Sequence, residues 1–148
     1  MMWGCISSEG CACIEILEKN VRMDSKMYLN ILERKLVRFM EIHSCTRFMQ
    51  DSAPCHVSKL TMGWFNRNRI EVLDWPGNSP DLNPIENVWK VLKSKVSLRN
   101  PTNIQELKTA IMNVWCNEIT PELCRRCIAS MPRRIKAVLD ARGGSTKY

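Results

Sequence analysis

Two acidic residues, Asp51 and Glu86, lie where the local sequence pattern holds a carboxylate in place. Asp51 ends a short strand-like run at residues 46–51, which a turn-rich segment at 52–56 interrupts. Glu86 follows a loop at 74–83 and falls in the first turn of a predicted helix. Thirty-four residues separate the two acids. Carboxylates carried by separate elements are the groups with which proteins hold hard cations such as Mg²⁺.

The helix that carries Glu86 has a well-marked start. Asp81 or Asn83 can cap it, and Pro84 suits its first position because a first-turn amide would be left unbonded in any case. A carboxylate in the first turn is stabilised by the free amides and the helix macrodipole. The apolar face of the helix recurs at helical spacing and consists of Ile85, Val88, Trp89 and Leu92. The pattern therefore predicts a rigid loop that fixes the position of Glu86.

The segments around both acids resemble those of a known family. The acids lie in QDSAPCH at positions 50–56 and in SPDLNPIENVW at positions 79–89. With their spacing, these segments resemble the DDE catalytic domain of mariner-superfamily DNA transposases. The segments SMPRRI at 130–135 and GGSTKY at 143–148 are similar to the usual end of such proteins, and the resemblance covers nearly the whole chain from Trp3 onward. It implies an α/β fold of the ribonuclease H-like type, a mixed sheet flanked by helices with a helical C-terminal extension.

The resemblance also implies a chemistry, the cleavage of phosphodiester bonds and strand transfer with two divalent metals, Mg²⁺ or Mn²⁺. Asp51 corresponds to the second acid of the catalytic triad and Glu86 to the third. His56 matches a family position beside the metals or a phosphate, and a capping or partly buried histidine is equally compatible with its setting. Asn83 and Asn87 flank Glu86, where they can position DNA or a metal water. For Asn83, capping is the better explanation.

The family's first acid has no counterpart in this sequence, because it belongs to a strand that precedes the hairpin with which this chain opens. We therefore expect a catalytic domain truncated at its N-terminus, with its first strand missing, an incomplete two-metal site and little or no activity. The family's helix-turn-helix region has no counterpart either. A missing strand leaves an unpaired sheet edge, which favours self-association. Two other acids lie near Glu86, and we expect Asp81 to cap the helix and Asp74 to anchor the loop.

Composition and charge are compatible with one domain that binds DNA. The 148 residues are 45% hydrophobic and 25% charged, and we expect a sheet-and-helix core at 1–97 followed by C-terminal helices at 98–148. No apolar run approaches the roughly 18 residues of a membrane span. The net charge is +7, and residues 119–148 carry seven Lys or Arg against two acids, which suits a phosphate backbone. The candidate DNA-binding residues are Lys90, Lys93, Arg125, Arg126, Arg133, Arg134 and Lys136.

A second interpretation makes the chain a non-enzymatic DNA-binding or interaction remnant that uses the basic C-terminal helices. Charge alone is equally typical of an ordinary solvated surface. Lys90 lies four residues after Glu86 and can pair with it instead of with DNA. By family, we expect the protein in the nucleus.

The eight cysteines point to reduced thiols, since no secretory segment precedes them and their spacing is irregular. Cys11 with Cys13 and Cys124 with Cys127 form two close pairs, but neither makes a recognisable zinc finger.

Hydrophobic periodicity and turn residues predict the order of elements. The expected elements are a hairpin of residues 2–7 and 11–17, a helix at 24–43 capped by Asp24, a strand at 46–51, a helix at 57–66, a strand at 70–73, the helix that carries Glu86, a helix from 104, and two shorter helices split by Pro132. This order predicts a mixed sheet covered by helices. We expect Trp75 and Trp89 to pack rather than stack on bases, and the tail at 143–148 to be mobile.

Overall fold

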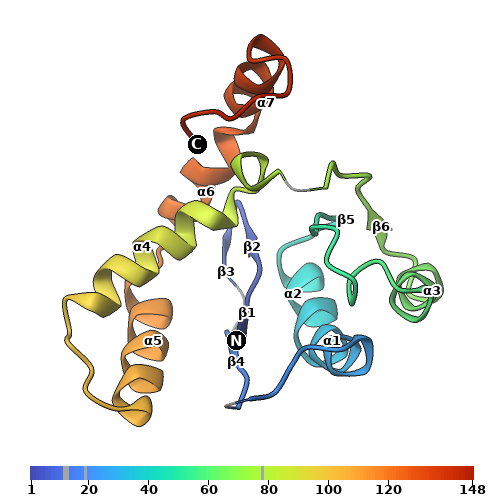
Figure 1. Ribbon diagram of the computed structural model, residues 1–148. Helices are drawn as coiled ribbons and strands as arrows, with labels where there is room; N and C mark the ends of the chain where they lie inside the picture. Colours follow the sequence, from blue (N-terminus) through green and yellow to red (C-terminus); the bar gives the residue numbers. More distant parts are fainter. Residues whose placement is uncertain (12–13, 19, 78) are drawn as a thin grey trace. The chain divides into compact units, whose positions relative to one another are not determined.

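The computed structural model describes residues 1–148 except 12, 13, 19 and 78, so the predicted role of Cys13 lies outside the described residues. Its helices and short strands are labelled in Figure 1. Within this described part, every helix falls short of the length and apolarity that crossing a bilayer requires.

The chain folds into two compact units. The first unit comprises residues 1–3 and 15–79, and the second comprises residues 4–14 and 80–148. The two acids singled out by the sequence therefore belong to different units, and each is described within its own. The predicted division of the chain after residue 97 stays a prediction.

The strands of the first unit form two short ladders. Strand β1 (Met2–Trp3) pairs antiparallel with β4 (Glu15–Ile16), and β5 (Arg47–Phe48) pairs parallel with β6 (Glu71–Val72). The amide of Leu73 donates to the Phe48 carbonyl at 2.9 Å and extends the parallel pair by one bond. Both pairing directions predicted for a mixed sheet are present. The ladders are shorter than the predicted strands, and β5 ends at Phe48, three residues before Asp51.

The helices of the first unit are those expected from the apolar periodicity. They are α1 (Ser25–Ile31), the π-helical turn η1 (Leu32–Leu36), α2 (Val37–Ile42) and α3 (Lys59–Arg67). The Asp24 carboxylate accepts a hydrogen bond from the Met27 amide at 2.8 Å, which confirms the predicted cap. The core of this unit includes the fully buried side chains of Tyr28, Ile31, Leu32, Leu36 and Phe65.

The second unit combines a small hairpin with helices. Its elements are β2 (Ile6–Ser7), β3 (Gly10–Cys11), the 3₁₀ turn η2 (Pro80–Leu82), α4 (Ile85–Ser97), α5 (Ile104–Glu118), α6 (Pro121–Ala129) and α7 (Met131–Asp140). Strands β2 and β3 pair antiparallel and pack on α6, while α4 packs on α5 and α6 (Figure 1). Pro132 lies in the first turn of α7, so the two predicted C-terminal helices are confirmed.

Packing of two tryptophans explains one conspicuous glycine in the second unit. Trp89 stacks on Trp115 with ring centroids 5.0 Å apart. A Cβ atom at Gly4 would lie 2.9 Å from the Trp115 ring and 3.0 Å from the Trp89 ring, so a larger residue would have to displace them. The predicted packing role of Trp89 is therefore confirmed. In the first unit, the buried indole N–H of Trp75 has no hydrogen-bond partner among the described residues.

Candidate catalytic carboxylates

Glu86 lies in the first turn of α4, as the sequence predicts. The amide of Ile85 donates to the Asn83 side-chain oxygen at 3.3 Å, and the amide of Glu86 donates to the Asn83 carbonyl at 3.1 Å. Asn83 therefore has the capping role that was preferred for it, while Pro84 occupies the N-cap position. The half-buried Glu86 carboxylate makes no hydrogen bond or ion pair with any residue that the structure describes, and this includes Lys90.

Asp51 is held differently, through its own carboxylate. Its Oδ1 atom lies 2.6 Å from Nδ1 of His56 and accepts a hydrogen bond from the Ala53 amide at 3.0 Å. The Asp51 side chain is 61% exposed, whereas the His56 side chain is only 18% exposed. Both of these bonds use Oδ1, and Oδ2 has no partner among the described residues.

Two side chains of the first unit, Tyr28 and Gln50, support this histidine. The His56 ring stacks on Tyr28 with centroids 4.2 Å apart. The Tyr28 hydroxyl donates to the Gln50 side-chain oxygen at 2.7 Å, and the Gln50 amide group donates to the His56 carbonyl at 3.2 Å. His56 is therefore partly buried and adjacent to Asp51, while its predicted place beside metals or a phosphate stays a prediction. Because the network fixes the ring, it also fixes the orientation of the Asp51 carboxylate.

Asn87 follows Glu86 on α4 and has an incomplete set of hydrogen bonds. Its side-chain oxygen is buried and has no partner in the described part of the chain. An unsatisfied buried acceptor of this kind costs about 1 to 3 kcal/mol, so its retention beside Glu86 calls for a reason other than stability.

Six of the seven basic residues predicted to contact DNA are exposed, and they differ in whether they form an ion pair. Lys90, Lys93, Arg126 and Arg133 are exposed and form no ion pair with the residues described. Arg125 is also exposed, but it pairs with Glu122 at 3.1 Å and lies 4.0 Å from Glu9. Lys136 pairs with Asp140 at 3.2 Å. Among these six, only the four cations without an ion pair can therefore contact a phosphate without first displacing an acidic side chain.

The structure contradicts the prediction that Arg134 contacts DNA. Its side chain is 1% exposed, and its guanidinium donates to the Asp81 carbonyl, so it cannot reach a DNA phosphate in this structure. Asp81 does not cap α4 as predicted, because its carboxylate accepts a hydrogen bond from Thr146 instead. The exposed Asp74 makes no bond within the described residues that would anchor the loop.

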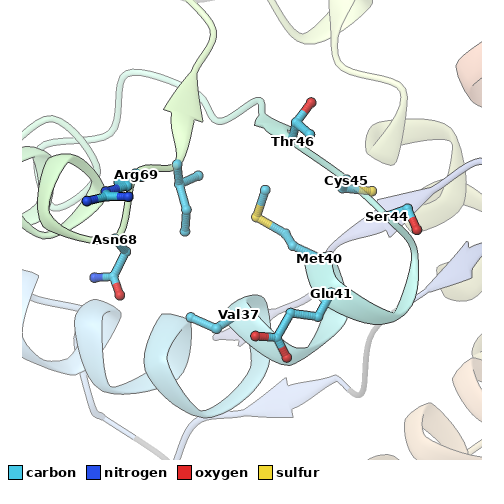
Figure 2. A pocket seen from close by; sticks show the side chains of 9 residues that line it. Val37, Met40, Glu41, Ser44, Cys45, Thr46, Asn68 and Arg69 are labelled. Carbon is cyan, nitrogen blue, oxygen red and sulfur yellow. The ribbon is translucent and has the colours of Figure 1, made fainter.

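A pocket of the first unit lies apart from these acids. Figure 2 shows side chains of α2 facing the turn after α3 across this open cavity of about 480 Å³. Two lining residues, Ser44 and Arg69, have φ of 51° and 56° because each ends a helix in the left-handed conformation. The pocket lies where the chain enters β5 and β6, whereas Asp51 follows the end of β5. None of the predicted site residues lines it.

Comparison with known proteins identifies the family. A family model described as "DDE superfamily endonuclease" matches residues 2–108 of the chain. The chain belongs to this family.

Transposases are among the relatives of this DDE domain. The chain is 36% identical over 151 residues to the transposable element Tc1 transposase of Caenorhabditis elegans, and the match covers 100% of the chain and 54% of that protein. The Tc3 transposase of the same organism is 34% identical over 152 residues, with 100% of the chain and 45% of that protein covered. The chain thus spans about half the length of the curated relatives it matches.

Solved structures show the fold of the DDE domain. The Mos1 transposase catalytic domain, solved with Raltegravir and Mn, superimposes with a TM-score of 0.87 at 17% sequence identity, covering 99% of this chain and 76% of that one. The corresponding structure with Mg gives the same TM-score at 18% identity. The predicted ribonuclease H-like α/β fold is therefore confirmed.

The donor atoms of this DDE domain suit a hard divalent cation. Mg²⁺ keeps several waters and takes only one or two carboxylates, and both Oδ2 of Asp51 and the Glu86 carboxylate are unengaged by the described residues. Within the described ranges, no three His, Cys, Asp or Glu side chains gather as a ready metal cage. Asp51 and Glu86, each described within its own unit, stay predicted metal ligands.

One feature of the second unit was not anticipated from the sequence. Cys11 on β3 and Cys124 on α6 share a hydrogen bond, which lowers the pKa of Cys11 and raises that of Cys124. Burial raises the pKa of Cys127 one turn further along α6. The seven described cysteines form no disulfide in this structure, and their reduced state stays a prediction. The C-x-x-C spacing at 124–127 was visible in the sequence, but its proximity to Cys11 depends on the packing of β3 against α6.

Proposed function

We propose that this chain is the catalytic part of a mariner-superfamily transposase and that its Asp51 and Glu86 carboxylates hold the divalent metals for DNA strand cleavage and strand transfer. One observation carries the proposal: Glu86, rigidly delivered by a capped helix start, keeps a carboxylate without any partner in the described chain. A half-buried carboxylate such as Glu86, which forms no ion pair with the lysine four residues away, is typical of a metal ligand rather than of a structural ion pair.

The other site residues act on these two carboxylates. His56 holds Oδ1 of Asp51, so that Oδ2 is presented to a metal. Asn87 offers a buried oxygen next to Glu86 that can accept a hydrogen bond from water or DNA. Mg²⁺ or Mn²⁺, when bound as a pair, stabilises the attacking and leaving oxygens of an in-line phosphoryl displacement.

The proposal includes a loss of activity in the isolated 148-residue polypeptide. The family resemblance calls for three acids, and this sequence matches the second and the third. A two-metal site with two of its three carboxylates binds metal weakly, and removal of a catalytic group commonly lowers rates by several powers of ten. We expect DNA binding to outlast nicking.

Metal affinity tests this function directly. In a titration of Mn²⁺ followed by the electron paramagnetic resonance of the free ion, Asp51→Asn and Glu86→Gln should each raise the Kd at least about tenfold, which is about 1.4 kcal/mol. Asp74→Asn is the matched control, since Asp74 is an exposed acid of the first unit with no partner among the described residues. An equal loss in Asp74→Asn would show that the wrong acids were chosen.

Plasmid nicking then tests whether the isolated chain is defective. Supercoiled plasmid should stay intact with Mg²⁺ or Mn²⁺. Nicking that disappears in both Asp51→Asn and Glu86→Gln would contradict the proposed defect and leave the DDE function standing.

A second candidate function, DNA binding without catalysis, is favoured by the exposed cations without acidic partners: Lys90, Lys93, Arg126 and Arg133. Such binding, which would also suit a nuclear location, should weaken linearly with salt on logarithmic axes and persist in Glu86→Gln. Replacing all four cations by Gln should reduce the salt slope. Retention of the full slope would contradict this role.

Self-association is a further part of the proposal. Within the described residues, each strand pairs on one side only, so edges remain available for a second copy. Sedimentation velocity should detect a dimer that strengthens with concentration, and a monomer at every concentration would refute it.

A further inference from the structure

The most deeply buried charge of the second unit belongs to Arg134 of α7. Its side chain is 1% exposed, and no carboxylate of the described chain forms an ion pair with it. Nε donates to the Ser130 hydroxyl at 2.7 Å, and Nη1 donates to the Asp81 carbonyl at 2.8 Å. The guanidinium also lies 4.9 Å from the ring centroid of Tyr148. A buried cation held only by neutral groups is expensive, so this arrangement requires a purpose.

The C-terminal tail also binds Asp81, in the η2 turn that Arg134 contacts. The Thr146 hydroxyl donates to the Asp81 carboxylate at 3.0 Å, and the amide of Tyr148 donates to the Thr146 hydroxyl oxygen at 3.4 Å. Arg134, Thr146 and Tyr148 thus form a C-terminal clamp on Asp81, with one bond to its carbonyl and one to its carboxylate. Contrary to the prediction of a mobile tail, this part of the chain is engaged.

The turn held by the clamp leads directly to Glu86. The amide of Asn83 donates to the Pro80 carbonyl at 3.0 Å, and the amide of Glu86 donates to the Asn83 carbonyl at 3.1 Å. Leu82 between them is buried at 7% exposure, and prolines at 80 and 84 restrict the backbone. A displacement of Asp81 is therefore transmitted along a stiff turn to the start of α4.

We propose that Arg134 is a positioning residue for Glu86: together with Thr146 and Tyr148 it fixes Asp81, and through the η2 turn it sets where the Glu86 carboxylate meets a metal. This inference rests on the proposed function in so far as Glu86 is a metal ligand. It explains why a cation of the basic C-terminal region is buried against a turn instead of being presented to DNA. It also gives Thr146 and Tyr148 a role in positioning Glu86.

Two readouts on the full chain test the clamp. Arg134→Lys keeps the charge but loses the two-pronged geometry, and Thr146→Val removes one bond at a partly exposed position, so both variants should fold. Arg142→Lys, the same type of change at an exposed position just after α7, is the matched control. Amide hydrogen exchange at residues 83–87 should accelerate about five- to tenfold in both clamp variants, the equivalent of about one hydrogen bond, and stay unchanged in the control. Amides of α5 should not change in any variant.

Mn²⁺ affinity is the readout that a merely structural role would not move. The Kd should rise about three- to tenfold in Arg134→Lys and Thr146→Val at unchanged helix content, and remain at the wild-type value in Arg142→Lys. Unchanged exchange at 83–87 in both clamp variants overturns the proposal. Faster exchange without a change in Kd overturns it as well, provided that Glu86→Gln weakens Mn²⁺ binding. If Glu86→Gln has no effect on the Kd, the proposed function fails instead, and hydrogen exchange alone decides whether the clamp holds the turn.

Discussion

The two candidate carboxylates are held in place in opposite ways. Asp51 is oriented through its own Oδ1, which is bound to His56 and to the Ala53 amide, and its exposed side chain needs this support. Glu86 is positioned through its backbone, by Asn83 and by the contacts on Asp81, while its carboxylate stays without a partner in the described chain. The difference teaches that a ligand can be made rigid either at its functional group or at the turn that carries it. The second route leaves both oxygens of the Glu86 carboxylate without a partner in the described chain.

Removal of the buried Arg134 guanidinium should give the largest loss of unfolding free energy among these variants. Arg134→Ala deletes a fully buried side chain and its two bonds to Ser130 and Asp81, so we expect the free energy of unfolding to fall by about 3 kcal/mol. Arg133→Ala on the exposed side of the same helix should stay within about 0.5 kcal/mol of the wild type. Urea denaturation measures both. Similar values for the two variants would mean that the turn before Glu86 does not depend on Arg134.

Replacement of either of two histidines of the first unit should have an intermediate effect on the free energy of unfolding, and only one replacement should affect Asp51. His56 stacks on Tyr28 and His43 stacks on Phe39, at 4.2 Å and 4.1 Å. Replacement of either by Ala should cost about 1 kcal/mol of unfolding free energy, since each loses one ring contact. Only His56→Ala should also raise the Mn²⁺ Kd, because it alone releases Asp51.

A conservative variant completes this test. In His56→Asn the side-chain amide can take the place of Nδ1, so it should recover part of the Mn²⁺ affinity that His56→Ala loses. Equal Mn²⁺ affinity in His56→Ala and His43→Ala would contradict the direct orientation of Asp51.

An ion-paired glutamate provides the smallest effect and a contrast with both ligands. Burial opposes ionisation of Glu15, but its bonds to Arg34 and Lys35, both at 3.0 Å, outweigh this and lower its pKa. A lowered pKa in the folded state contributes stability above the ordinary glutamate pKa of about 4.3, and this stability is lost as the pH falls through the folded value. Unfolding free energy should therefore drop below about pH 4 by less than about 1 kcal/mol. Glu15→Gln should flatten this part of the pH profile, and an unchanged profile would refute the assignment.

Local features of the site were predictable because their causes lie within a few residues. The cap at Asp24, the start of α4 before Glu86 and the capping role of Asn83 all follow from hydrogen bonds between near neighbours. The Asp51–His56 bond spans five residues, and the sequence allowed it without requiring it. The extent of strand pairing was less predictable, because β5 and β6 come from distant segments and their pairing ends at Phe48, three residues before Asp51.

The sequence by itself determined the family, the order of the helices and the two acids to consider, since motifs, spacing and helical periodicity are properties of short segments. Only the tertiary structure decided that Arg134 is buried, because that depends on Asp81, 53 residues earlier, and on the ring of Tyr148. The same holds for the bond between Thr146 and Asp81, which spans 65 residues. Burial is a sum over partners that are remote in sequence, so a cation in a basic segment could not be assigned to surface or core before the chain was folded.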